Sequence, residues 1–153
     1  MLDSYDRKIL MLLQRSTEQS VAEIADEIGL SVTPCWRRIR KLEEQGYIKK
    51  RVALLDEAKL NVGVSVFMAV RTNQHTKKWA KDFVDAVNQI PEIVDVFRLA
   101  GDVDYMLRAV VPDIATFDMV YQRLIDKVDI YDVSSMFAME TIRSSTELPL
   151  DYA

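Results

Sequence analysis

Basic side chains gather on one short stretch of this chain, although the chain as a whole is acidic. Residues 33–52 hold seven lysines and arginines against two glutamates, whereas the 153 residues together carry a formal net charge of −4. Cations clustered in this way suit a surface that neutralises nucleic-acid phosphates. A solvated helix face is the alternative explanation, so the elements that carry the cations decide between the two. The cations are Arg37, Arg38, Arg40, Lys41, Lys49, Lys50 and Arg51.

The stretch around these cations predicts two short helices joined by a tight turn. Ser20 and Glu23 have the spacing of a capping box, and the small apolar residues after them predict a helix that ends at Gly29. Ser31 or Thr33 then caps a second helix, and a basic strand follows it. Helix, turn, helix and strand in this order form a DNA-reading unit, which favours nucleic-acid binding over a merely solvated face.

The second helix is expected to turn its N-terminal residues toward the major groove of DNA. This places Thr33, Trp36 and Arg37 nearest the base edges. We expect Arg37 to read sequence, because a bidentate pair with guanine gives ~1–3 kcal/mol of discrimination. For Trp36 two roles remain open, contact with a thymine methyl group or sugar, and packing between helix and strand. The remaining cations are expected to reach phosphates: Arg38, Arg40, Lys41, Lys49, Lys50 and Arg51.

Composition predicts a cytosolic protein with two functional parts. Apolar residues make up 49% of the chain, yet no run approaches the ~20 residues needed to span a bilayer, and the N-terminus lacks the pattern of a signal peptide. The single cysteine, Cys35, lies on the apolar face of the second helix, where packing is its expected role. Residues 1–52 have a formal charge of +2 and the remainder −6, an asymmetry that suggests two different tasks.

After residue 61 the chain alternates between strand and helix patterns in the order βαββαβ. Strands are expected at 62–70, 93–100, 105–111 and 130–139, with helices beginning after Thr76 and Pro112. This order predicts a ferredoxin-like domain, an antiparallel four-stranded sheet with both helices on one face. The predicted class is therefore α+β. Its parts are a winged helix-turn-helix DNA-binding domain at 1–52, a linker at 53–61 and the ferredoxin-like effector-binding and oligomerisation domain at 62–153.

Two helices can cover only one face of this sheet, so the other face needs a different partner. The same face of a second copy is the simplest one, which predicts a homodimer. The bare face is expected to include some of Phe67, Ala69, Phe97, Ser135, Phe137 and Met139.

A second candidate site is the loop from Gly101 to Tyr105. Its amides suit an α-carboxylate, and Asp102 or Asp104 could receive an α-ammonium group, with hydroxyls added by Ser134 and Ser135. A plain β-turn, with glycine at positive φ and aspartates bonding local amides, explains the same residues. The residues alone favour the turn.

Several motifs resemble the Lrp/AsnC family of regulators, over essentially the whole chain. They are Leu2-Asp3-x-x-Asp6-Arg7-Lys8-Ile9-Leu10, Ile28-Gly29-Leu30-Ser31, Thr33-Pro34-Cys35-Trp36, Arg38-Ile39-x-Lys41-Leu42-Glu43-x-x-Gly46-x-Ile48 and Ala100-Gly101-Asp102-Val103-Asp104-Tyr105. The sequence looks most similar to the DecR-type, cysteine-responsive branch. Within the family, the last motif resembles the effector-site loop.

The resemblance implies a transcriptional regulator of double-stranded DNA whose dimers assemble further, commonly into octamers. It implies amino-acid effectors bound near contacts between dimers. Effector residues are then expected at Gly101, Asp102, Asp104, Tyr105, Ser134 and Ser135. Cysteine, leucine and methionine remain candidate effectors.

Catalysis has little support in the sequence. His75 is the only histidine and lies in a polar segment, and with one cysteine it cannot complete a usual zinc site. No phosphate-binding glycine motif is present, so we expect neither a cofactor nor a metal. Two functions remain: an amino-acid-responsive regulator in the bacterial cytosol or nucleoid, and an effector-independent, chromatin-like protein that organises DNA. A regulatory subunit of a metabolic enzyme would leave the basic segment without a role.

Overall fold

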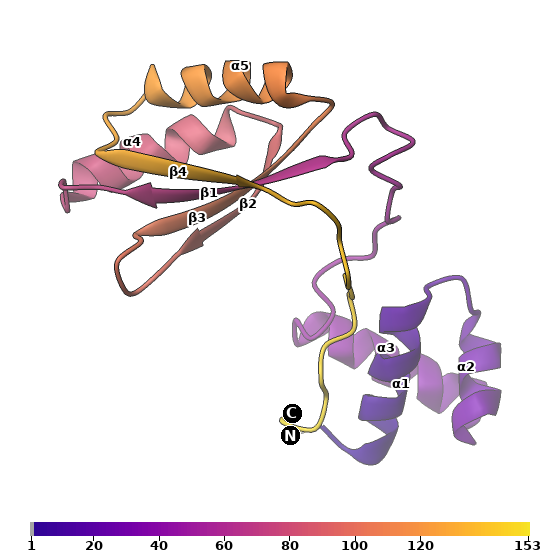
Figure 1. The fold of residues 1–153 in the computed structure, drawn as a ribbon. Helices are drawn as coiled ribbons and strands as arrows, with labels where there is room; N and C mark the ends of the chain where they lie inside the picture. The colour runs from indigo at the N-terminus through magenta and orange to yellow at the C-terminus, as the bar shows by residue number, and fades with distance from the viewer. Residues whose placement is uncertain (1) are drawn as a thin grey trace. The chain divides into compact units, whose positions relative to one another are not determined.

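The computed structural model describes residues 2–153, which form two compact units (Figure 1). The first unit, called the head below, contains residues 2–54 together with Ile142–Ala153. The second unit is Leu55–Thr141. The division differs from the predicted one at two points: the linker expected at 53–61 is shared between the units, and the last residues were expected in the C-terminal domain. They belong to the head because Leu150 packs against its apolar core.

The head is built from three helices whose ends are set by local capping. They are α1 (Ser4–Arg15), α2 (Val21–Ile28) and α3 (Val32–Glu44). Asp3 caps α1 and Ser20 caps α2, each in a reciprocal capping box, and Gly29 ends α2 at a φ of 75°. These caps confirm the predicted boundaries. Their shared core consists of Leu2, Ile9, Leu10, Leu12, Ile24, Ala25, Ile28, Cys35, Ile39 and Leu42.

Two details of the head differ from the prediction. Ser31 occupies the position before α3, but its hydroxyl makes no capping hydrogen bond. Residues 49–56 form no strand, so the expected basic strand is absent from this part of the described chain. An isolated strand leaves its backbone groups unpaired, and no neighbouring strand is available in the head to bond them.

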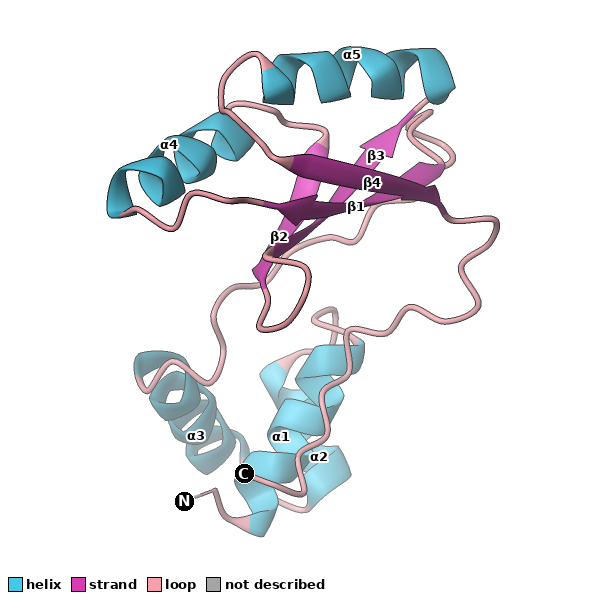
Figure 2. Ribbon diagram, turned by 60° about the vertical axis from the view of Figure 1, so that its left-hand side comes forward, coloured by secondary structure: helices cyan, strands magenta, loops and turns pink. Residues whose placement is uncertain are grey.

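The second unit has the predicted βαββαβ order. Its elements are β1 (Val64–Arg71), α4 (Lys77–Asn88), β2 (Ile93–Arg98), β3 (Tyr105–Val111), α5 (Ile114–Ile125) and β4 (Asp132–Phe137). The strands form one antiparallel sheet in the order β2-β3-β1-β4, and α4 and α5 cover the same face of it (Figure 2). Within residues 2–153, none of the helices has the length and apolar character needed to cross a bilayer.

Strand register decides which residues lie on the bare sheet face. Residues directly opposite each other in an antiparallel pair share a face. Ser135 pairs with the buried Met68, and Phe137 packs edge-on against Phe117 of α5, so both lie on the helix-covered face. The prediction that some of six named residues lie on the bare face is confirmed by Phe67, Ala69 and Phe97, whereas Ser135 and Phe137 do not lie there. That face also carries the exposed Met136 and Ser134, which is opposite Ala69.

Candidate functional site

Helix α3 is fixed in the head by one buried stripe. Cys35, Ile39 and Leu42 are all buried in the core formed with α1 and α2. Burial raises the pKa of the Cys35 thiol, which favours the uncharged form and agrees with a packing role. The stripe leaves Arg37 exposed and Trp36 with 51% of its surface accessible. Trp36 is therefore outside the core.

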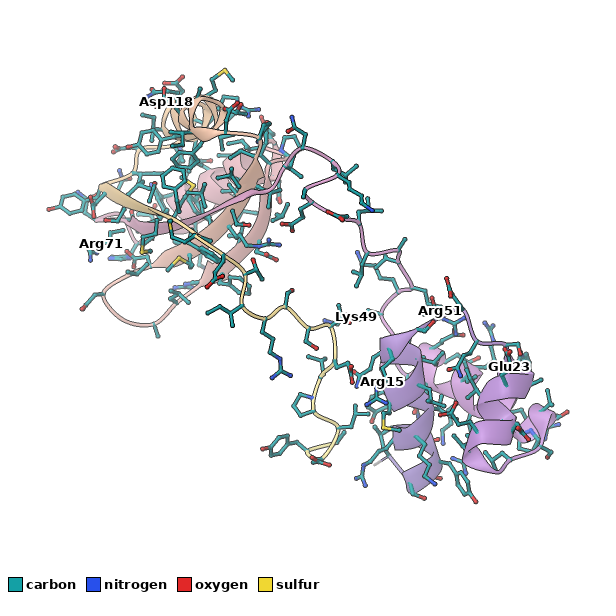
Figure 3. All side chains as sticks on the ribbon, turned by 45° about the vertical axis from the view of Figure 1, so that its right-hand side comes forward. Arg15, Glu23, Lys49, Arg51, Arg71 and Asp118 are labelled. Carbon is teal, nitrogen blue, oxygen red and sulfur yellow. The ribbon has the colours of Figure 1, made fainter. Side chains whose placement is uncertain are left out.

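Ion pairing separates the seven clustered cations into two groups. Arg40 and Arg51 both bind the carboxylate of Glu43, at 3.2 and 2.8 Å. Arg38 binds two carboxylates of α1 and its cap. For residues 2–153, no carboxylate lies within 4.0 Å of the remaining four, which are Arg37, Lys41, Lys49 and Lys50. These four exposed cations, part of them on the segment after α3 (Figure 3), form the available basic surface.

Arg38 has a structural role that the sequence did not predict. Its guanidinium lies 2.6 Å from a carboxylate oxygen of Asp3 and 2.7 Å from one of Asp6, and 5.4 Å from the centre of the Tyr5 ring. Hydrogen bonds to Asp6 and then Asp3 raise the pKa of Arg38, whereas the Asp6 amide and Arg38 lower that of Asp3. Arg38 thus joins α3 to the start of α1. Both contacts use Nη1, so the remaining guanidinium donors are free of partners within residues 2–153, and the expected phosphate contact of Arg38 stays a prediction.

The loop between β2 and β3 is closed by hydrogen bonds within the chain. A carboxylate oxygen of Asp104 accepts from the Thr72 amide at 2.8 Å, and the Asp104 amide donates to the Val70 carbonyl at 3.0 Å. Arg71 donates to the Asp102 carbonyl at 3.0 Å and pairs with Asp132 at 3.1 Å. These bonds hold the loop at the ends of β1 and β4. The bond of Asp104 reaches the amide of Thr72 in a distant part of the sequence, whereas a plain β-turn would use local amides.

A cavity of about 160 Å³ opens beside this loop, in the second unit. Asp104 and Tyr105 line it, as do two cations that the sequence did not single out, Lys77 at the start of α4 and Arg98 at the end of β2. The Tyr105 ring packs 4.5 Å from that of Phe83, which fixes one wall. The carboxylate of a ligand in this cavity would be stabilised by these two cations and by the N-terminus of α4. Arg98 could have been predicted as a lining residue from the sequence, because it lies three residues before Gly101.

The other predicted effector residues lie outside this cavity. Gly101, at a φ of 138°, and Asp102 are exposed on the loop. Ser134 and Ser135 are neighbours on β4, so their hydroxyls point to opposite faces of the sheet. Only Ser134 lies on the bare face. A single copy therefore brings together Asp104 and Tyr105 and leaves the remaining four apart.

Comparisons with known proteins cover both units. Residues 2–49 match the family model for a winged helix-turn-helix DNA-binding domain, and residues 65–148 match that for the Lrp/AsnC ligand binding domain. The chain is 40% identical to the DNA-binding transcriptional activator DecR of Escherichia coli, over 99% of this chain and 100% of DecR.

Two solved structures share the fold over 99% of both chains. An AsnC family transcriptional regulator from Agrobacterium tumefaciens is 55% identical with a TM-score of 0.96. The transcriptional regulator NMB0573 of Neisseria meningitidis, solved in complex with L-Met, is 33% identical with a TM-score of 0.93. The helix-turn-helix head, the ferredoxin-like unit and these matches lead to one assignment: the chain belongs to the Lrp/AsnC family of transcriptional regulators.

Proposed function

We propose that this regulator binds paired half-sites on double-stranded DNA as a homo-oligomer, and that an amino acid bound in its second unit changes that binding. The observation that supports it most is the set of four unpaired cations on and after α3, in a chain whose net charge is −4. Exposed cations on and beside a helix with a buried anchoring face can bind DNA phosphates.

In this proposal the DNA contacts divide by position on the head. Thr33, Trp36 and Arg37 meet base edges, with Arg37 making the sequence-reading contact. Lys41, Lys49 and Lys50 meet phosphates directly. Arg40 and Arg51 do so after exchanging Glu43 for a phosphate, a smaller gain because an existing ion pair is lost. The proposed DNA-bound protein acts in the bacterial cytosol or nucleoid.

The effector is proposed to bind around the loop between β2 and β3. Arg98 and Lys77 hold the α-carboxylate in the adjoining cavity, and Asp104 faces the α-ammonium group. The L-Met complex of a regulator 33% identical over nearly the full chain supports an amino acid as the ligand. Gly101, Asp102, Tyr105, Ser134 and Ser135 are proposed to complete the site when a second copy packs beside the loop.

Oligomerisation is proposed to begin at the bare sheet face. Phe67, Phe97 and Met136 are 38%, 56% and 50% exposed there, and exposed apolar side chains gathered on one face mark an interaction surface. The same face of a second copy gives a two-fold dimer. Further assembly, to the octamer that the family resemblance suggests, would place several heads on one particle.

Fluorescence anisotropy tests the proposal directly. The full-length protein is titrated into duplex DNA from upstream of its own gene and into a scrambled duplex, at fixed salt, with and without cysteine, leucine and methionine. We expect the upstream duplex to bind more tightly and its affinity to shift with at least one amino acid. Specific binding without any shift would support the DNA-organising alternative, and equal binding to both duplexes would contradict sequence-specific regulation.

A further inference from the structure

The chain enters the head a second time after β4. Residues 142–153 leave the second unit and run beside α1, as both ribbon views show (Figures 1 and 2). This C-terminal segment has no helix or strand of its own. Its placement therefore depends on the groups that it meets on the head.

One side chain of α1 holds the segment by its backbone. The Gln14 amide nitrogen donates to the Leu148 carbonyl at 3.2 Å, and the Gln14 amide oxygen accepts from the Leu148 amide at 2.9 Å. The Thr146 hydroxyl adds a bond to the Gln14 carbonyl at 3.4 Å. A primary amide that pairs with both groups of one residue reproduces strand pairing. It satisfies backbone groups that would otherwise remain unbonded beside the helix.

Charge and apolar contacts extend this attachment on both sides. Arg15 pairs with Glu147 at 3.0 Å, and Arg7 donates to the Ala153 carbonyl oxygen. Leu150 packs against the core that contains Leu2 and Leu10. The segment also forms one wall of a cavity of about 440 Å³ in the head, with Lys49 and Lys50 on another wall. The attachment therefore adjoins the proposed DNA-binding surface.

This attachment gives the head two covalent connections to the second unit. The chain crosses between them at Leu54 to Leu55 and again at Thr141 to Ile142. The first connection alone would restrain the head weakly, because residues 49–56 have no regular structure. Fixing a second point on α1 removes orientations that a single flexible connection allows.

We propose that the C-terminal segment is a tether, docked on α1 through Gln14, that restrains the head relative to the second unit. The restraint raises the effective concentration of the second head once the first has bound, because fewer orientations must be lost. It thereby favours paired half-sites over single ones. This last consequence rests on the proposed DNA-binding function; the docking and the restraint do not.

Full-length Gln14→Ala tests the tether, with Gln122→Ala on the exposed side of α5 as the matched control. A chain that ends at residue 141 serves as a second released form. Hydrogen exchange at residues 146–150 reports docking, and tryptic cleavage at 49–59 reports restraint, both without DNA. We expect faster exchange at residues 146–150 in Gln14→Ala and roughly tenfold faster cleavage in both released forms, with Gln122→Ala like the parent in both measurements. Equal exchange in Gln14→Ala and the parent, or equal cleavage in parent and released forms, would overturn the tether.

Duplexes with one or two half-sites then test the consequence for DNA. We expect Gln14→Ala to bind a single half-site within about twofold of the parent and to lose on the order of tenfold on the paired site. Equal loss on both duplexes, or no loss, would contradict the role in paired binding. Failure of the parent to prefer its upstream DNA would contradict the proposed function instead, and the cleavage and exchange results would still decide the tether.

Discussion

The recognition helix and the loop between β2 and β3 expose their charged groups in opposite ways. Around α3, Arg37, Lys41, Lys49 and Lys50 stay in solvent without a carboxylate partner among the described residues. In the loop, by contrast, the Asp104 carboxylate already accepts a hydrogen bond from the Thr72 amide. The proposed DNA surface would therefore be complete in one copy, whereas the proposed effector site would need rearrangement or groups from another copy.

The difference has a physical reason. The buried stripe of α3 holds Arg37 and Lys41 in position without bonds of their own, whereas Lys49 and Lys50 lie on the irregular segment that follows. The loop between β2 and β3 has no such stripe, and hydrogen bonds to β1 keep its shape. Arg38 combines both features: it lies on α3, yet its guanidinium binds Asp3 and Asp6 and so joins α3 to α1.

Arg37→Ala is the variant with the largest expected effect on the DNA side of this comparison. Loss of a bidentate base contact should relax preference at one base pair by ~1–3 kcal/mol, roughly 5- to 150-fold. Arg40→Ala is the matched control, because Arg40 neighbours it on α3 but is paired with Glu43. Anisotropy across a panel of single-base variants of the site measures both. Unchanged preference at every position would assign sequence reading to another residue.

Substitutions of Asp104 separate its structural role from its proposed role in the effector site. Asp104→Ala should cost about 1–3 kcal/mol of stability, since the amide of the buried Thr72 loses its acceptor. Asp104→Asn keeps an acceptor oxygen and removes the charge. We expect the Asn variant to unfold near the parent temperature while losing the response to amino acids. An intact response in the Asn variant would place the α-ammonium group elsewhere.

Local patterns predicted most of the head and the order of elements in the second unit. The caps at Asp3, Ser20 and Thr76 depend on residues within one turn, so they can be read from the sequence. The direction of Ser135 depends on how β4 pairs with β1, which no local pattern specifies. The contact between Gln14 and Leu148 joins residues 134 positions apart and was equally out of reach.

Arg38→Ala should weaken the head. The carboxylates of Asp3 and Asp6 would lose their shared partner, and the loss of stability should be small because the site is partly solvated. Thermal unfolding measures the loss, and the salt dependence of DNA binding tests the phosphate contact. A shallower salt dependence would show that Arg38 also contacts a phosphate.

Lys49→Ala and Lys50→Ala should lower DNA affinity equally for specific and scrambled duplexes. Each lost phosphate contact should reduce the slope of log affinity against log salt by about 0.9. Lys59→Ala is a suitable control, since Lys59 is paired with Asp56 in the second unit. A loss confined to the specific duplex would show that these lysines read sequence as well as charge.

The capping box of α2 predicts the smallest effect, a pH dependence of head stability. Hydrogen bonds from the Ser20 hydroxyl and amide lower the pKa of Glu23 below its ordinary value of 4.5. The carboxylate therefore stabilises the fold above that ordinary pKa, and this contribution is lost as the pH falls through the lowered value. The unfolding free energies of the parent and Glu23→Gln should differ at pH 7 and converge as the pH falls below the lowered pKa of Glu23. A difference that is constant across this range would show that the charge of Glu23 does not stabilise the helix start that positions α2 beneath α3.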